Sequence, residues 1–278
     1  MICAHCGNHT DPNTAYCTTC GADRNQPPTW PNVRTFAVRG LGLATVVALA
    51  AASAVRLLTA VVLPLIGRHL WEQSAAAGTS DGVAWALRLR WVGTVVDFLV
   101  LVVTAVLVTN WLWRARKNLD AFPGAGSDLG AGWAFGGWIT PLANFVIPCQ
   151  LVFQVAKQSL HRRWVGPVVA GWWTCYLSYQ FLPRLLDLDD LGYLKGRDYD
   201  VEQYLLVNGG MALVFAVAGG CLAFLVYHVS QAQTDRIARG EVVHAYAAYA
   251  AAAAQSVTAV PDGVPGGGQA VAGGTIQV

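Results

Sequence analysis

The sequence predicts an all-α membrane protein with a small metal-binding head, from its composition, its apolar segments and its cysteine pattern. The chain has 278 residues, of which 55% are hydrophobic and 12% are charged. Soluble globular domains carry roughly 25% charged residues, so this chain has too few charges to cover a water-exposed surface. The net charge of +2 also provides no strongly basic surface. These values argue against a soluble enzyme, a disordered chain and a basic nucleic-acid binder.

Four apolar segments are long enough to form transmembrane helices, because a helix needs roughly 20 mostly apolar residues to cross about 30 Å of hydrocarbon. The third segment is the least apolar, since Pro167 lies near its start and Gln180 near its end. We assign residues 41–239 to one four-helix transmembrane domain. Its predicted spans are about residues 41–66, 91–113, 164–183 and 205–227.

The basic residues indicate how the chain is oriented in the membrane. They are concentrated before the first span, between the second and third spans, and after the fourth span. Cytoplasmic segments of membrane proteins carry the excess of Lys and Arg. We therefore expect a multi-pass protein of the cell membrane with its N- and C-termini in the cytoplasm.

A fifth apolar stretch, residues 133–156, is long enough to span but is interrupted by Pro141, Asn144 and Pro148. If it crossed the membrane, the basic residues that follow it would lie outside, against the predicted orientation. We interpret it as a re-entrant or interfacial helical segment on the cytoplasmic side, where protein or water covers the interrupted backbone. A fifth span kinked at its prolines is the alternative.

Two matched Cys-x-x-Cys-Gly motifs at the N-terminus contain Cys3, Cys6, Cys17 and Cys20. Four thiolates presented in pairs by two tight turns can bind zinc tetrahedrally, and the glycine after each pair relieves the turn. We predict a zinc ribbon over residues 1–23 and a Pro-rich linker over residues 24–40.

Other chemistry could use the same cysteines. Two disulfides are disfavoured by the reducing cytoplasm, and a rubredoxin-like iron site has similar knuckles. His5 and His9 could replace a ligand, although their spacing breaks the paired pattern. With Tyr16 before the third cysteine, the segment resembles the short zinc-ribbon heads of bacterial membrane proteins.

Arg56 and Asp97 are charged residues within the first and second predicted spans. Charges at such depth are costly and usually face a bundle interior or a water-filled cavity. Arg56 shares a face with alanines that recur every four residues, and small residues let a second helix approach closely. We predict that Arg56 and Asp97 pair with each other. The pair would either line a polar cavity or fix the register of two helices.

A motif of tryptophan, arginine, asparagine and proline residues begins at the end of the second predicted span and continues in the fifth apolar stretch. Basic residues suit an anionic lipid surface, and its prolines cannot continue a helix. We expect one of two structures. The first is a cytoplasmic groove that binds lipid head groups or a partner helix, and the second is a plug that closes the inner face of the bundle. The motif residues are Trp113, Arg114, Arg116, Asn118, Trp138, Pro141, Asn144 and Pro148.

In the order of these motifs and helices, residues 41–239 resemble the actinobacterial membrane family called domain of unknown function 4328. The resemblance implies the membrane layout described above and implies no activity. The family motif commonly continues with an acidic residue before a tryptophan, where this chain has Gln154 and Ala156. Any function served by that acid is absent here.

Residues 240–278 form the predicted cytoplasmic tail. Residues 241–255 are alanine-rich and suit a frayed helix. From Ser256 onward, prolines and glycines without a hydrophobic period predict disorder.

The sequence contains no Walker, dinucleotide-binding, HExxH or serine-elbow motif, so we expect no enzyme. The first hypothesis is a membrane-anchored binding or regulatory module whose zinc ribbon docks a cytoplasmic protein, with membrane lipid around its helices. The alternative is a small transporter or channel that uses Arg56 and Asp97 and needs a homo-oligomer to provide room for a pathway. Nucleic-acid binding by the ribbon is not favoured, because residues 1–24 contain a single basic residue.

Overall fold

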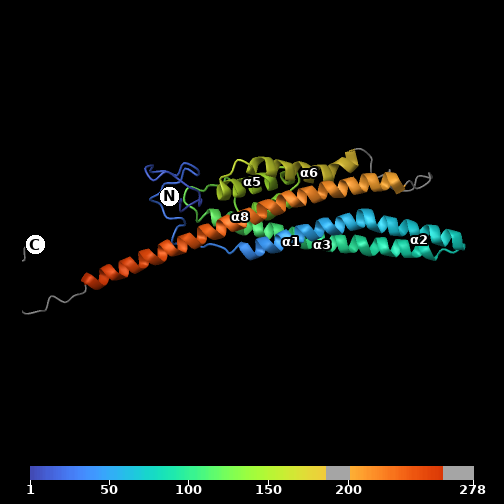
Figure 1. Ribbon diagram of the computed structural model, residues 1–278, viewed down its shortest axis with the longest axis horizontal. Helices are drawn as coiled ribbons and strands as arrows, with labels where there is room; N and C mark the ends of the chain where they lie inside the picture. The colour runs from blue at the N-terminus through green and yellow to red at the C-terminus, as the bar shows by residue number, and fades with distance from the viewer. Residues whose placement is uncertain (186–200, 259–278) are drawn as a thin grey trace, which may run out of the picture.

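The computed structural model describes residues 1–185 and 201–258, and the helices of this part run roughly parallel to one long axis (Figure 1). Apart from two isolated β-bridges, Ile2 with His9 and Tyr16 with Asp23, the described part contains helices and loops. The prediction of an all-α protein is confirmed. The N-terminal head lies near one end of the axis, which we call the head end (Figure 1).

The first helical hairpin is longer than a bilayer. Helix α1 (Arg39–Leu57) continues through a π-helical turn, η1 (Leu58–Val62), into α2 (Leu63–Ala77). Helix α3 (Asp81–Leu119) returns antiparallel to them. At 1.5 Å per residue each arm is about 58 Å long, nearly twice the roughly 30 Å hydrocarbon core. The end of this hairpin away from the head therefore extends beyond any bilayer that the rest spans.

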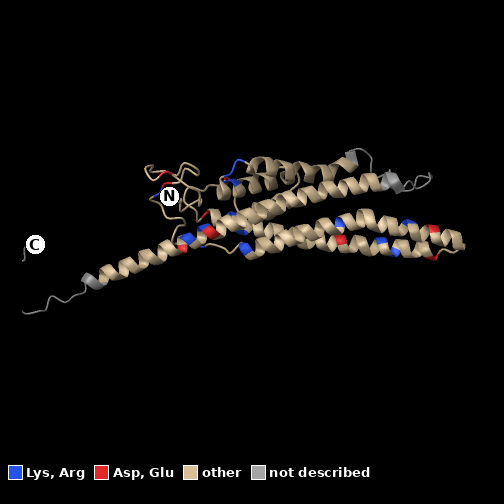
Figure 2. Ribbon diagram, viewed as in Figure 1, with Lys and Arg blue, Asp and Glu red and all other residues tan. Residues whose placement is uncertain are grey.

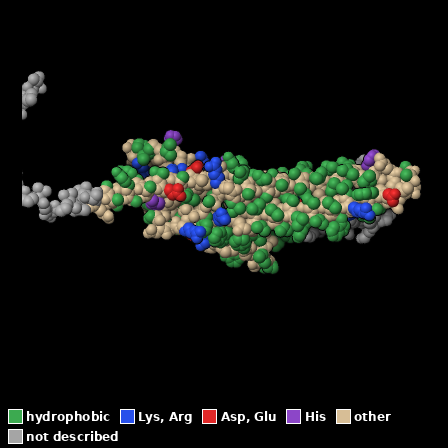
Figure 3. Space-filling view, turned by 90° about the horizontal axis from the view of Figure 1, so that it is seen from below, with side chains coloured by type: hydrophobic (Ala, Val, Ile, Leu, Met, Phe, Trp, Pro, Cys, Tyr) green, Lys and Arg blue, Asp and Glu red, His purple; other side chains and the backbone are tan. Residues whose placement is uncertain are grey.

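Three helices of the described part are long and apolar enough to cross a membrane: Arg39–Ala77, Asp81–Leu119 and Leu205–Gln255. Hydrophobic side chains cover the body of the molecule between its charged ends (Figure 3). Helix α6 (Val165–Leu185) forms where the third span was expected, but its two tryptophans, two tyrosines and Gln180 make it less apolar. The third predicted span, residues 164–183, therefore stays a prediction.

Residues 133–160 run away from the head end beside the bundle and turn back. Helix α4 (Trp133–Ile139), the 3-10 turn η2 (Ala143–Phe145) and helix α5 (Ile147–Leu160) form this segment. At its tip Phe145 stacks on Phe181 with ring centroids 5.1 Å apart, about 24 Å along α6 from its first residue. After α5, Arg162 donates to Asn8 of the head over 2.8 Å. The segment thus turns back to the head end instead of continuing as one helix across the molecule.

A buried polar junction holds the chain together at the head end. The Asn118 side chain donates to the main-chain oxygen of Phe36 and to the side-chain oxygen of Gln233 (2.9 Å each), and it accepts from the Phe36 amide (2.7 Å). Gln233 donates to the Ala115 carbonyl and the Ser159 hydroxyl, each over 3.0 Å. The junction joins α3, α5, α8 (Val201–Thr258) and the segment before α1.

The segment between the head and α1 packs against the bundle and is not a free spacer. The Trp30 amide donates to the Ala121 carbonyl over 2.9 Å, Val38 is fully buried, and Phe36 is held by Asn118. These contacts form because the segment runs beside the end of α3. The predicted linker, residues 24–40, therefore belongs structurally to the folded domain.

The tail residues begin as a direct continuation of α8, which ends at Thr258. The C-terminal part of the helix extends away from the body of the molecule (Figure 1), and Val242, Tyr246 and Tyr249 are exposed along it. The alanine-rich stretch is thus helical, and the predicted disorder after Thr258 lies outside the described residues.

We expect Asn118→Leu to destabilise the protein, because three buried groups lose their partner: the Phe36 amide, the Phe36 carbonyl and the side-chain oxygen of Gln233. Each unsatisfied group costs about 1–3 kcal/mol, so we expect a loss of about 3 kcal/mol in total. Thermal unfolding of the purified protein measures this loss. Asn110→Leu is the matched control, because Asn110 donates only within its own helix, to Val106. Equal unfolding temperatures for the two variants would contradict the role of Asn118.

Candidate functional site

The two cysteine knuckles of the head have the same local structure. In each, the glycine amide donates to the carbonyl of the first cysteine, over 2.9 Å from Gly7 to Cys3 and 2.8 Å from Gly21 to Cys17. Gly7 and Gly21 have φ angles of 72° and 70°, a left-handed conformation that a side chain disfavours. The sequence therefore folds both ends of the head into equivalent turns that present their cysteines to one another.

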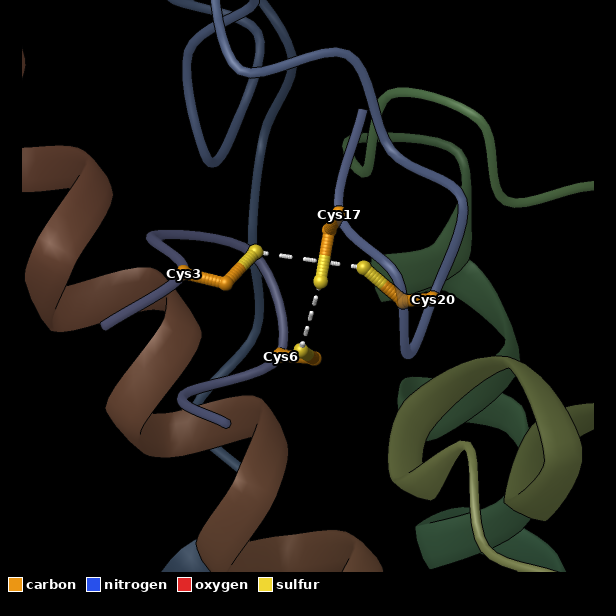
Figure 4. Close-up of side chains that lie close together, drawn as sticks. All are labelled: Cys3, Cys6, Cys17 and Cys20. Atoms are coloured by element: carbon orange, nitrogen blue, oxygen red, sulfur yellow. Dashed lines mark hydrogen bonds between the residues drawn. The ribbon is translucent and has the colours of Figure 1, made fainter. Parts of the chain in front are cut away.

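All four predicted ligands meet at one point (Figure 4). Their Sγ atoms lie within 4.8 Å of one another, with Cys3–Cys20 and Cys6–Cys17 separations of 3.9 and 3.8 Å. A tetrahedral zinc ion with Zn–S bonds of about 2.3 Å requires S–S separations of about 3.8 Å. The separations exceed the roughly 2.05 Å of a disulfide. The four side chains can hold a metal ion and fit zinc in number, chemistry and spacing.

The two histidines near the cysteines do not join this cluster. His5 is buried, and its Nε2 lies 3.0 Å from the Gln26 carbonyl while its Nδ1 lies 3.1 Å from Arg236 Nη2. With the Nε2 proton donated to Gln26, Nδ1 accepts from Arg236. Burial, and then the nearby Arg236, lower the pKa of His5, which favours this neutral form. Both ring nitrogens are occupied, and His9 is exposed.

The thiols differ in their tendency to lose a proton. A hydrogen bond donated by Cys20 lowers the pKa of Cys6 to about 4, while the same contact raises the pKa of Cys20. Burial raises the pKa of Cys3. A metal ion binds thiolates, so it must displace the protons of Cys3 and Cys20. Metal affinity therefore falls as the pH falls.

Arg56 and Asp97 lie together as the sequence predicted they would. Arg56 Nη2 is 2.7 Å from Asp97 Oδ2, and the two side chains are 26% and 14% exposed. The Arg56 guanidinium also lies 5.5 Å from the ring centroid of Tyr179 and 5.7 Å from that of Phe215. The ion pair thus forms where α1, α3, α6 and α8 meet. It lies about 25 Å along the axis of α1 from Arg39, the first residue of that helix.

The basic part of the motif makes contacts within the protein. Trp113 packs edge-on against Phe36 with centroids 5.2 Å apart, and Arg114 donates to the Ala37 carbonyl over 3.3 Å. Arg116 is buried and donates to the carbonyls of Leu129 and Ser127. Together with Asn118, these residues fix the loop after α3 and the segment before α1. The contacts favour the plug over the open groove.

The second part of the motif builds the tip of the segment formed by residues 133–160. Trp138 packs edge-on against Trp173 and Tyr176, and the backbone turns after Pro141. Pro148 is the second residue of α5, in the first turn, where a missing amide proton breaks no hydrogen bond of the helix. In the part of the chain that the structure describes, Trp138 Nε1 and Asn144 Oδ1 are buried without a partner.

Two pockets lie along this segment. The first, of about 30 Å³, is lined by Asn144, Tyr176 and Gln180 among others, and it has room for a water molecule at the orphaned Asn144 oxygen. The second, of about 470 Å³, is an open surface hollow beside Trp133 and Gly136. Gln154, which stands where the family resemblance suggests an acid, hydrogen-bonds the Ser127 hydroxyl.

Sequence reasoning missed Gln233, Arg236 and Arg239. Each is three residues from the next on α8, so they lie on one face, and Gln233 and Arg236 are buried. Their spacing just beyond the fourth apolar run was the available signal. It could not identify their partners, which lie 74 or more residues away in the sequence.

Asp97→Leu should destabilise the protein by about 2 kcal/mol, because it leaves Arg56 without its counter-charge in apolar surroundings. This is less than the full cost of breaking a buried ion pair, since Arg56 is partly exposed. Thermal unfolding is the measurement. Adding Arg56→Met should restore most of the loss, since the unpaired charge is then removed. Glu72→Leu is the control, because it breaks the exposed Arg68–Glu72 pair, which contributes little. An equal loss in Asp97→Leu and Glu72→Leu would contradict the prediction.

Comparison with known proteins confirms the family resemblance. Residues 74–260 match a family model described as a domain of unknown function (DUF4328). The match covers about two thirds of the chain, including α3 to α8, and it begins after the cysteine cluster and α1. Searches of curated proteins and of solved structures gave no match. The chain therefore belongs to the family defined by this domain of unknown function, DUF4328.

Proposed function

We propose that the protein is a membrane-anchored, zinc-binding module that presents its N-terminal head to a protein partner and catalyses no reaction. The single observation that carries this is the meeting of Cys3, Cys6, Cys17 and Cys20 within 4.8 Å. Such a small head has almost no hydrophobic core of its own, and structural zinc supplies the folding energy in domains of this kind. A four-sulfur tetrahedral site also suits iron, which the metal analysis below distinguishes from zinc.

The position of the charges supports a cytoplasmic head. Lysines and arginines gather where the head meets the bundle, and a second group lies toward the opposite end of the α1–α3 hairpin (Figure 2). The first group includes Arg39, Arg114, Lys117, Arg162 and Arg163. An excess of basic residues favours the cytoplasmic side and the anionic lipid there. We place both ends of the chain in the cytoplasm of a cell membrane.

The surface of the head offers a partner site. Ile2 and Tyr16 are 63% and 61% exposed on the head, next to the two β-bridges that the knuckles hold. Exposed apolar side chains on a rigid support suit protein recognition, in which tyrosine is enriched. The partner in this proposal is a cytoplasmic protein that binds the metal-loaded head.

A small transporter is the second candidate, and the Arg56–Asp97 pair is the observation that favours it. Neither of the two pockets described above includes Arg56 or Asp97. The pair instead closes on itself over 2.7 Å, as a pair that fixes helix register does. We therefore rank transport below the binding module.

Metal analysis tests the first proposal. The purified full-length chain should contain zinc, and cobalt loaded in its place should give the absorption of tetrahedral cobalt thiolates. Cys3→Ser combined with Cys17→Ser should abolish both signals, because two of four ligands are lost. Cys175→Ser is the control, since Cys175 lies in α6, away from the head. Iron, or cobalt spectra unaffected by the double substitution, would overturn the zinc assignment.

Photo-crosslinking tests the partner. A photoreactive residue at position 16 should capture a specific protein in cells, and this product should disappear when Cys3 and Cys6 are changed to serine, because the head surface then loses its fold. The same probe at position 246, on the exposed part of α8, should be unaffected by these changes. A product at position 16 that persists without the cysteines would contradict a metal-dependent partner site.

A further inference from the structure

Helix α8 holds the first cysteine knuckle directly. Arg239 Nε donates to the Ala4 carbonyl over 2.8 Å, and its Nη2 lies 3.4 Å from the His5 carbonyl. Ala4 and His5 are the two residues between Cys3 and Cys6. The direction of both carbonyls therefore depends on how the two cysteines are held.

Arg236 lies one turn earlier on the same face, and its side chain is buried, with the residue 5% exposed. It donates to the carbonyls of Pro28 and Pro123 over 2.9 and 3.1 Å and to His5 over 3.1 Å. Its guanidinium lies 4.4 Å from the Phe122 ring centroid. All of these partners are neutral, and no carboxylate in the described part of the chain forms an ion pair with Arg236 or Arg239.

A buried charge without a counter-charge is costly, and the metal centre supplies one. Four thiolates around a divalent ion have a net charge of about −2. The Arg236 guanidinium lies beside this centre, because it contacts His5, the residue directly before Cys6, over 3.1 Å. A bound metal also fixes Cys3 and Cys6, and with them the Ala4 and His5 carbonyls that Arg239 contacts. Metal loading thus changes both the charge and the surface that the head presents to α8.

We propose that Arg236 and Arg239 are the outer counter-charges of the metal–tetrathiolate centre, so that metal occupancy holds the head against α8 and metal loss releases it. This inference rests on the proposed metal site and adds its coupling to the bundle. The two arginines are positioning residues, since they contact the knuckle and not the metal.

The release is confined to the head, because the following segment has its own anchors. Thr29 contacts His244 over 3.1 Å, and Gly240 approaches Thr29 so closely that a Cβ there would collide with it. The backbone contacts of Trp30 and Phe36 with the end of α3 involve no cysteine. Residues 28–40 therefore stay in place while the residues before them detach.

Coupling of this kind is reciprocal. If the metal strengthens the contact between the head and α8, then the contact must strengthen metal binding by the same factor. A substitution on α8, in a helix that provides no metal ligand, should therefore weaken metal binding. A head that merely rests on α8 would bind metal equally well without these contacts.

The experiment measures zinc affinity of the full chain in detergent or nanodiscs, by competition with a chelating indicator. Arg239→Gln should weaken zinc binding about tenfold, because it removes a charge-assisted contact to the knuckle. Arg239→Lys should retain most of the affinity, since it keeps the counter-charge. Arg163→Gln makes the same charge change at an exposed position near the head and should have no effect.

Trypsin cleavage after Arg24 reports the position of the head in the same samples. Arg24 is held by the carbonyls of Pro12 and Thr14, each over 2.7 Å, so the loaded head should resist cleavage. Removing zinc with a chelator should expose this bond while cleavage after Arg39 stays unchanged. In Arg239→Gln, less chelator should be needed.

The outcomes separate the two proposals. Wild type that binds neither zinc nor cobalt would remove the metal site itself. Wild type that binds zinc, together with unchanged affinity in Arg239→Gln and cleavage after Arg24 that is independent of metal, would leave the metal site and overturn the coupling to α8. Equal weakening in Arg239→Gln and Arg163→Gln would also overturn it, because general charge would then be the cause.

Discussion

The head end of this molecule depends on one constraint, that every polar group removed from water must find a partner. Asn118 meets it by using its whole amide group, accepting from the Phe36 amide and donating to Phe36 and Gln233. Gln233 in turn reaches α3 and α5. Because these hydrogen bonds join segments far apart in the sequence, they also decide where the segment before α1, the end of α3 and α8 come together.

The charged residues follow the same constraint with different solutions. Arg56 has a carboxylate, Asp97, at 2.7 Å, and two aromatic rings beside it. Arg116 donates hydrogen bonds to a main-chain carbonyl and to the carboxylate of Asp120, which is more exposed. Arg236 has neutral partners only in the described part of the chain. It therefore depends most on a charge supplied by the cysteine cluster.

Features that depend on residues close together in the sequence were predictable, and contacts between segments far apart in the sequence were predictable only in part. The cysteine cluster was predictable, because two local turns at fixed spacing bring the four thiols together. The helices followed from apolar runs, and the Arg56–Asp97 pair from two charges in adjacent runs. The packing of residues 24–40 was not predictable, because prolines indicate a stiff segment but not its contacts with Ala121 and Asn118. Residues 133–160 were predictable in part. Their prolines indicate that the helix is interrupted, but the sequence does not indicate the contact of Phe145 with Phe181 that positions the turn.

Helix α8 contacts both sites, through Arg236 and Arg239 at the head and through Phe215 at Arg56, about 31 Å apart along the helix. Between them it packs closely on α1: a Cβ at Gly42 would collide with Ser230, and one at Gly219 would lie 2.8 Å from Ser53 Oγ. These close contacts leave little room for α8 to rotate or slide against α1. Beyond Ser230, Arg236 and Arg239 carry the contacts of α8 with the head. Contacts with the head and contacts with the ion pair thus lie on either side of the part of α8 that packs closely on α1.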